Sequence, residues 1–181
     1  MNLQLKVDGK EYRVGCSVLD YGIGSIPDVD EYSSLYYQLA KSPSSNIRKE
    51  IAEKECIDDE TLSILINDTQ LCVLKEIIGN NNVSERISEA ELIRVIELND
   101  SELCCSIAEN IESFCRCDPS LIAEKLYSNK DPVVRVALAE NSSTPKHVVR
   151  KLLKDSDPDV VDKASYDVRP LWKLKRSRRS I

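Results

Sequence analysis

A pattern of short apolar segments recurs along the chain, and it constrains the fold more than any other feature. The clearest copy begins at Asp131-Pro132 with Val-Val-Arg-Val-Ala-Leu-Ala-Glu-Asn and runs to about Asp155. Other copies begin at residues 44, 70, 100 and 157, so the steps between starts are 26, 30, 31 and 26 residues. A period of this length is typical of stacked helical units. We therefore expect each copy to form a pair of short helices.

The ends of these helices are marked by pairs of residues that favour helix starts. Such pairs occur at Asp118-Pro119, Asp131-Pro132, Thr144-Pro145 and Asp157-Pro158. The first residue can cap the orphan backbone N–H groups, and proline fits the first helical position because no N–H is needed there. Ser88 and Glu91 have the spacing of a capping box. The acidic run Asp58-Asp59-Glu60 is expected to stabilise a helix N-terminus through its dipole.

Apolar residues four apart mark one face of each second helix. The pairs are Leu35 and Leu39, Leu62 and Ile66, Leu92 and Ile96, Ile122 and Leu126, and Val148 and Leu152. Helices of about ten residues are unstable alone, so their free energy must come from stacking on neighbouring pairs. The sequence predicts a mainly α protein, an α-solenoid of about five helix pairs over residues 30–168.

The first 29 residues differ from the repeats. Leu3, Leu5 and Val7 alternate with polar residues, Asp8-Gly9 favours a tight turn, and residues 10–14 can form a second strand. A lone hairpin is marginally stable, so we expect this one to cap the helices. Glycines and Pro27 make residues 15–29 a predicted loop. The predicted divisions are thus a cap over 1–29, the repeats over 30–168 and a basic tail over 169–181.

The run from Asp131 to Asp155, with Val-Arg-x-Ala-x-Ala-Glu-Asn, then Thr-Pro, then Val-x-x-x-Leu, resembles the leucine-rich repeat variant. This is a short helical repeat akin to HEAT and armadillo repeats. The similarity extends over about residues 100–168 and is faint over 30–99. It implies a right-handed superhelix that serves as a binding scaffold. Some members carry an iron–sulfur cluster on an N-terminal cysteine motif, which this sequence lacks, so no cofactor is expected.

Charge is distributed unevenly along the chain. The whole sequence has 25 basic and 31 acidic residues, a net charge of −6, but residues 173–181 hold five basic residues and no acid. The remaining 20 basic and 31 acidic residues leave −11 on residues 1–172. Such a body repels phosphate, which disfavours nucleic acid as a partner, and it suits a basic protein. The tail itself could grip nucleic acid, acidic lipid or protein, or be a solvated end.

Candidate partner-binding residues follow from this charge and from the tyrosines. Acidic side chains expected on second helices are Asp59, Glu60, Glu91 and Glu124. Tyr32 and Tyr36 are added because tyrosine is enriched at binding hot spots. Tyr36 and Tyr37 are adjacent and point about 100° apart on a helix, so at least one of them should lie near the surface.

No set of residues indicates catalysis or a metal site. His147 is the single histidine, and neither a nucleophile elbow nor a phosphate-binding glycine loop occurs. Cys104, Cys105, Cys115 and Cys117 could supply four metal ligands, but their spacing is unusual for zinc, and free cysteine commonly fills apolar contacts. The prediction is a protein that is not an enzyme, without metal or cofactor.

The sequence also carries expectations about location and function. It shows neither a secretory signal nor an apolar run of about 18 residues, and its seven irregularly spaced cysteines suggest reduced thiols, so a cytoplasmic protein is expected. Its expected role is stoichiometric binding of another protein, most specifically as an acidic immunity-type inhibitor of a basic toxin or nuclease. A general scaffold or adaptor, and a nucleic-acid-binding repeat protein that uses the basic tail, remain as alternatives.

Overall fold

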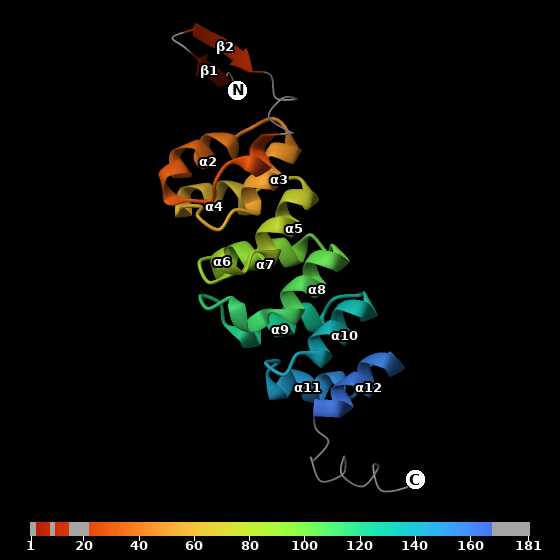
Figure 1. The fold of residues 1–181 in the computed structure, drawn as a ribbon. Coiled ribbons are helices and arrows are strands. Elements are labelled where there is room, and N and C mark those ends of the chain that lie inside the picture. Colours follow the sequence, from red (N-terminus) through yellow and green to blue (C-terminus); the bar gives the residue numbers. More distant parts are fainter. Residues whose placement is uncertain (1–2, 8–9, 15–21, 168–181) are drawn as a thin grey trace, which may run out of the picture. The chain divides into compact units, whose positions relative to one another are not determined.

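The computed structural model describes residues 3–7, 10–14 and 22–167, and the chain is mainly helical (Figure 1). The chain divides into two compact units, Met1–Ile87 and Ser88–Ile181. The predicted turn at Asp8-Gly9, residues 15–21 of the predicted loop and the predicted tail at 169–181 lie outside the described residues.

The first unit opens with two paired strands. Strand β1 (Leu3–Val7) and strand β2 (Lys10–Val14) are antiparallel, with Leu3 opposite Val14 and Leu5 opposite Tyr12. Within the predicted loop, a short 3₁₀ turn, η1 (Ile23–Ser25), packs against α3.

Short helices make up the rest of the first unit. They are η2 (Asp30–Tyr32), α2 (Ser33–Leu39), α3 (Ser45–Ala52), α4 (Asp59–Ile66), α5 (Leu71–Gly79) and α6 (Asn81–Ser84). Helix α3 packs against α5, and α2 packs against α4. Ile47 and Ile51 of α3, and Val73 and Ile77 of α5, are completely buried, as their i, i+4 spacing predicts. Burial of these faces supplies the stability that such short helices lack alone.

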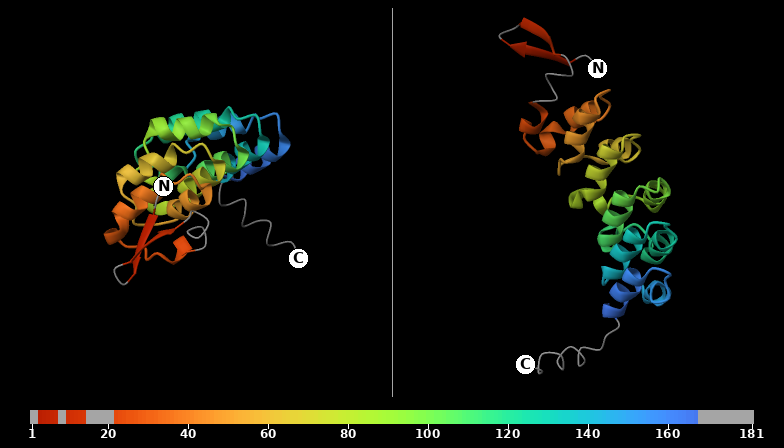
Figure 2. Two further views of the ribbon diagram at one scale, coloured as in Figure 1. Left: turned by 90° about the horizontal axis from the view of Figure 1, so that it is seen from above. Right: turned by 90° about the vertical axis from the view of Figure 1, so that its right-hand side faces the viewer.

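The second unit has the same plan. Its elements are α7 (Glu89–Glu97), α8 (Ser101–Glu109), η3 (Ile111–Ser113), α9 (Pro119–Tyr127), α10 (Pro132–Glu140), α11 (Lys146–Leu152) and α12 (Pro158–Asp167). Helix α10 contacts both α8 and α12, while α9 contacts both α7 and α11. Within this unit the helices therefore form two rows (Figure 2). The first helices of the pairs are α8, α10 and α12, and the second helices are α7, α9 and α11.

Most predicted helix starts agree with the structure. The residues at the predicted starts of the copies, 44, 70, 100 and 131, are N-caps of α3, α5, α8 and α10. The carboxylates of Asp118 and Asp131 accept backbone hydrogen bonds from Ser120 (2.8 Å) and Val133 (3.0 Å). Asp157 does the same for Asp159 at 2.9 Å. Ser88 and Glu91 form the capping box at the start of α7.

The predicted cap at Thr144 is wrong. Its buried hydroxyl donates to the carbonyl of Leu138 at 2.6 Å, which closes the turn after α10. The helix after it begins one residue later than predicted, at Lys146, with Pro145 as an N-cap that has no side-chain cap bond. A threonine oxygen can serve either end of a turn, and here the preceding carbonyl is the partner that it meets.

The apolar pairs predicted for the second helices lie in the core. Leu62, Leu92, Ile96, Ile122, Leu126, Val148 and Leu152 are almost fully buried, as are Leu39 and Ile66. Leu35 is the exception, because it is only half-buried on α2.

Two polar contacts recur at equivalent places in the two units. Arg48 of α3 binds Asp68, which lies 20 residues later in the loop before α5, through Nε–Oδ2 at 2.5 Å and Nη2–Oδ1 at 3.0 Å. Arg135 of α10 binds Asp155 across the same separation, at 2.8 and 2.9 Å. Each arginine thus links one first helix to the loop that precedes the next first helix.

In each unit, an asparagine that follows one first helix binds the C-terminal end of the first helix before it. Asn80, after α5, donates through Nδ2 to the carbonyls of Ala52 and Lys54, both at 2.9 Å, at the end of α3. Asn141, after α10, donates in the same way to Ala108 and Glu109, at 2.9 and 3.0 Å, at the end of α8. These bonds satisfy terminal carbonyls that the helices leave without a partner.

Candidate functional site

The two tyrosines predicted to bind a partner differ in burial. Tyr36 is completely buried on α2, and its hydroxyl donates to the carbonyl of Pro27, so its prediction as a contact residue is wrong. Burial raises the pKa of its phenol. Tyr32 is 37% exposed at the end of η2. Tyr37, the neighbour of Tyr36, is half-buried under the ammonium of Lys41, 3.4 Å from the ring centre.

Asp59 and Glu60 line an open groove between α2 and α4 in the first unit. The groove has a volume of about 560 Å³, and Tyr37, Lys41 and Ile64 also line it. Asp59 binds Arg86 at 2.9 Å, so one of the two predicted carboxylates is already engaged within the chain. Lys41 further reduces the negative character of this groove.

Glu91 and Glu124, predicted on second helices, are engaged within the chain as well. Glu91 accepts hydrogen bonds from the backbone N–H and hydroxyl of Ser88 in the capping box. Glu124 of α9 accepts two bonds from Lys151 of α11, both at 2.6 Å, and its Oε1 lies 3.2 Å from Nε2 of His147. The hydrogen bonds from Lys151 lower the pKa of Glu124.

The row of second helices does not present the acidic surface that the sequence analysis expected in the second unit. Lys125 of α9 pairs with Glu97 of α7 at 3.0 Å, so α9 and α11 each supply a cation to an acid on the second helix before them. The row ends at α11 and the turn after it, with five exposed side chains that are basic or histidine: Lys146, His147, Arg150 and Lys151 of α11, and Lys154 just after it.

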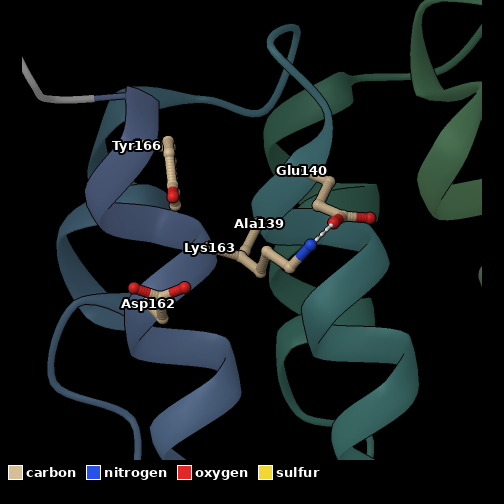
Figure 3. Close-up of a pocket in the computed structure, with 5 residues that line it drawn as sticks. All are labelled: Ala139, Glu140, Asp162, Lys163 and Tyr166. Carbon is tan, nitrogen blue, oxygen red and sulfur yellow. Dashed lines mark hydrogen bonds and ion pairs between the residues drawn. The ribbon is translucent and has the colours of Figure 1, made fainter. Parts of the chain in front are cut away.

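The acidic surface instead lies on the row of first helices, in a groove between α10 and α12. One end, about 460 Å³ in volume, is lined by Ala139, Glu140, Asp162, Lys163 and Tyr166 (Figure 3). The other end, about 300 Å³, is lined by Pro132, Val133, Val136, Asp157, Asp159, Asp162 and Lys163. Because Asp162 and Lys163 line both parts, the two form one continuous surface, which we call the α10–α12 groove.

The α10–α12 groove is lined by exposed apolar side chains together with acidic side chains, and we call the acidic ones its rim. Val133 is 59% exposed and Tyr166 is 57% exposed, both high values for large apolar side chains. The rim carries four carboxylates, from Glu140, Asp157, Asp159 and Asp162, against one ammonium, Lys163, so its net charge is −3.

Lys163 reaches from α12 across the groove to the carboxylate of Glu140 on α10 (Figure 3). This hydrogen bond raises the pKa of Lys163, so the ammonium stays charged throughout the physiological range. The pair links the two facing helices at the surface, where both side chains are exposed.

Local sequence explains why α12 supplies most of the rim. Asp157 caps the helix, and Asp159 lies in its first turn, where the helix dipole favours a negative charge. Asp159, Asp162, Lys163 and Tyr166 are spaced i, i+3, i+4 and i+7, which places them on one helix face. This spacing is visible in the sequence, although the sequence-based prediction placed the acidic surface on the second helices.

The cysteines occupy separate kinds of environment. Cys104 and Cys117 are buried, and burial raises the pKa of each thiol to about 11. Cys72 and Cys115 are exposed. Over the described residues, no group of three or more His, Cys, Asp or Glu side chains is arranged to hold a metal ion.

In the part of the chain that the structure describes, every helix is too short or too polar to cross a membrane. Comparisons with protein-family models, with curated proteins and with solved structures found no match.

Proposed function

We propose that this protein is a helical-repeat module that binds a basic protein stoichiometrically through the α10–α12 groove, without catalysing a reaction. The observation that carries the proposal is the groove itself, with a net charge of −3 around the exposed side chains of Val133 and Tyr166. Protein-binding surfaces commonly combine apolar side chains with polar ones in this way. The rim charge would steer a basic partner and speed its association.

The proposed architecture behind this surface is an α-solenoid of the HEAT-like or leucine-rich repeat variant type, right-handed as the resemblance implies, with the N-terminal hairpin as its cap. The rows of helices within the second unit and the recurring Arg48–Asp68 and Arg135–Asp155 contacts support a serial arrangement of like units. Such a scaffold presents side chains of successive helices on one extended face.

The most specific form of the proposal is an immunity-type inhibitor that acts in the cytoplasm on a basic toxin or nuclease. A general adaptor uses the same groove and differs only in what its partner does. Once a partner is identified, its activity distinguishes the two roles. An equimolar amount of this protein should inhibit the partner if it is an immunity-type inhibitor, and should leave the activity unchanged if it is an adaptor.

The experiment that tests the groove is quantitative affinity capture from the source cells with three full-length baits. They are the wild type, the groove variant Asp159→Lys/Asp162→Lys, and the control Glu55→Lys/Glu85→Lys. Glu55 and Glu85 are exposed and lie outside the groove, so both variants change the net charge equally.

The wild type and the control should retain the same basic protein at 50 mM salt, and the groove variant should retain at least about tenfold less, which corresponds to about 1.4 kcal/mol. Binding should weaken by 500 mM salt because the charges are screened. Equal retention by all three baits, or no basic protein on any of them, would overturn the proposal.

Nucleic acid is a second candidate, favoured by the exposed basic side chains of α11. A duplex DNA and a single-stranded RNA should both be retained by the wild type on this account. Arg150→Glu/Lys154→Glu should abolish that retention, whereas the groove variant should not.

A further inference from the structure

The segment that follows α12 has the composition that the α10–α12 groove is suited to bind. Residues 168–181 read Val-Arg-Pro-Leu-Trp-Lys-Leu-Lys-Arg-Ser-Arg-Arg-Ser-Ile, with six basic residues and no acid. Leu171, Trp172 and Leu174 lie among the first of these charges. A groove lined by both exposed apolar and acidic side chains complements such a segment in both charge and polarity.

The last described residues before this segment lie beside the groove. Helix α12 ends at Asp167, one residue after Tyr166, which lines the groove at the end that Glu140 shares. The groove extends from there toward Val133, over the length of a helix of 9 or 10 residues, about 15 Å. Fourteen residues can reach about 46 Å when extended, so the segment can turn back and follow the whole groove.

We propose that residues 171–179 dock in the α10–α12 groove of their own chain, with Trp172 and its leucine neighbours over Val133 and Tyr166 and the basic side chains on the rim. This inference rests on the proposed function in one respect, namely that the groove is a binding surface. It adds that the protein itself carries an occupant, which a basic partner must displace.

Tethering makes weak docking sufficient. A short flexible connection gives a local concentration in the millimolar range, so a segment whose free affinity is about 100 μM occupies the groove most of the time. A groove that is open one tenth of the time binds its partner with about tenfold weaker apparent affinity. Docking of residues 171–179 therefore sets a threshold for partner binding.

The test places the photocrosslinking residue p-benzoyl-L-phenylalanine at Val133 in the full-length protein. The matched control carries it at Leu121, an exposed apolar position on α9 that does not line the groove. After irradiation at 50 mM salt, peptide mass spectrometry should find residues 171–179 attached at position 133 and not at position 121. The attachment should fall at least about fivefold at 1 M salt, where charges are screened within about 3 Å.

Two further arms identify the basis of docking and its occupant. Asp159→Lys/Asp162→Lys should remove the attachment, and Glu55→Lys/Glu85→Lys should leave it unchanged. In a mixture of ¹⁴N- and ¹⁵N-labelled chains, attached peptides should come from one isotope only. Absence of the segment from position 133, equal attachment at both positions, or mixed-isotope products, which indicate docking on a second copy, would each overturn the inference.

The outcome is separable from that of the proposed function. Neutralising the segment with Lys173→Ser/Lys175→Ser/Arg176→Ser/Arg178→Ser/Arg179→Ser should raise partner capture about tenfold. If capture depends on the groove but the attachment is absent, the proposed function is supported and the docking is refuted. If the attachment is found but neither the wild type nor this neutralised variant captures a partner, the docking is supported and the proposed function is refuted.

Discussion

Arg135 donates two hydrogen bonds to Asp155, from Nε at 2.8 Å and from Nη2 at 2.9 Å, while its third nitrogen, Nη1, donates to the carbonyl of Asn129. The side chains are only 12% and 5% exposed. A guanidinium suits this geometry because its nitrogens form a rigid fork. The contact joins the loop before α10, helix α10 and the loop before α12, so it fixes three segments with one side chain.

Breaking this pair should destabilise the second unit strongly. Asp155→Asn should cost about 3 kcal/mol at pH 7, because Arg135 then stays buried without its counter-charge. Arg135→Lys should also destabilise, since an ammonium cannot make the paired bonds. Urea denaturation followed by circular dichroism measures both, with the exposed Arg150→Lys as the control. Wild-type stability in Arg135→Lys would contradict the structural role of the fork.

The same pair predicts a pH dependence. Hydrogen bonds from Arg135 lower the pKa of Asp155 in the folded state. The resulting stabilisation is complete above the unfolded carboxyl pKa of about 3.9, and it is lost as the pH falls through the lower folded value. The stability difference between wild type and Asp155→Asn should therefore be constant from pH 5 to 8 and shrink below pH 4. A difference that grew on acidification would have the wrong sign.

Replacing Asn80 with aspartate should destabilise the protein. In Asn80→Asp an oxygen replaces the nitrogen that donates to Ala52 and Lys54, so a negative charge faces two carbonyls. We expect a loss of about 2 kcal/mol or more in the free energy of unfolding at pH 7. Asn81→Asp, at an exposed neighbouring position, is the control and should change stability by less than about 0.5 kcal/mol. Equal losses in the two variants would show that the bonds from Asn80 contribute nothing.

Tyr36→Phe should remove a stabilising bond without affecting partner binding. The buried hydroxyl donates to Pro27, so its loss should cost about 1 kcal/mol. Burial raises the pKa of the Tyr36 phenol above its ordinary value, so it should ionise at high pH. Alkaline titration followed by absorbance near 295 nm should show the loss of one high-pH component in the variant. Reduced capture of a partner that binds the α10–α12 groove would indicate that Tyr36 has a role beyond the core.

The cysteines should differ in reactivity. At pH 8 a thiol with a pKa of about 11, as for Cys104 and Cys117, has over about 100-fold less thiolate than an ordinary cysteine. Brief iodoacetamide treatment should label Cys72 and Cys115 and spare the buried pair, as peptide mass mapping can show. Labelling in guanidinium is the control, where all should react alike. Protection of Cys115 that a chelator removes would instead indicate a bound metal.

Local signals predicted where helices begin and which of their faces are buried. Asp118, Asp131 and Asp157 cap helices because a carboxylate followed by proline satisfies backbone N–H groups whatever surrounds it. The apolar spacing of Ile122 and Leu126 requires a buried face in any packed arrangement. Thr144 shows the limit of such local signals. Its hydroxyl could cap the following helix or donate to a preceding carbonyl, and the folded turn decides for the carbonyl of Leu138.

The proposed binding surface was harder to predict, because the sequence does not show which charged side chains pair with one another. Glu124 is an obvious acid on a second helix, yet Lys151, 27 residues later, neutralises it. Tyr36 and Tyr37 are equivalent in the sequence, and the packing of α2 against α3 and α4 decides which one is buried. Asp159 and Asp162 become part of a groove only because α10 lies beside α12.

The sequence by itself therefore determined the helical class, the period of the repeat and most helix ends, since these depend on bonds within a few residues. Only the tertiary structure decided that Arg135 meets Asp155, that Glu124 is neutralised, and that the acidic surface lies on the first helices. Contacts between separate helices depend on how their faces pack, and a short repeated sequence leaves that packing open until all its neighbours are in place.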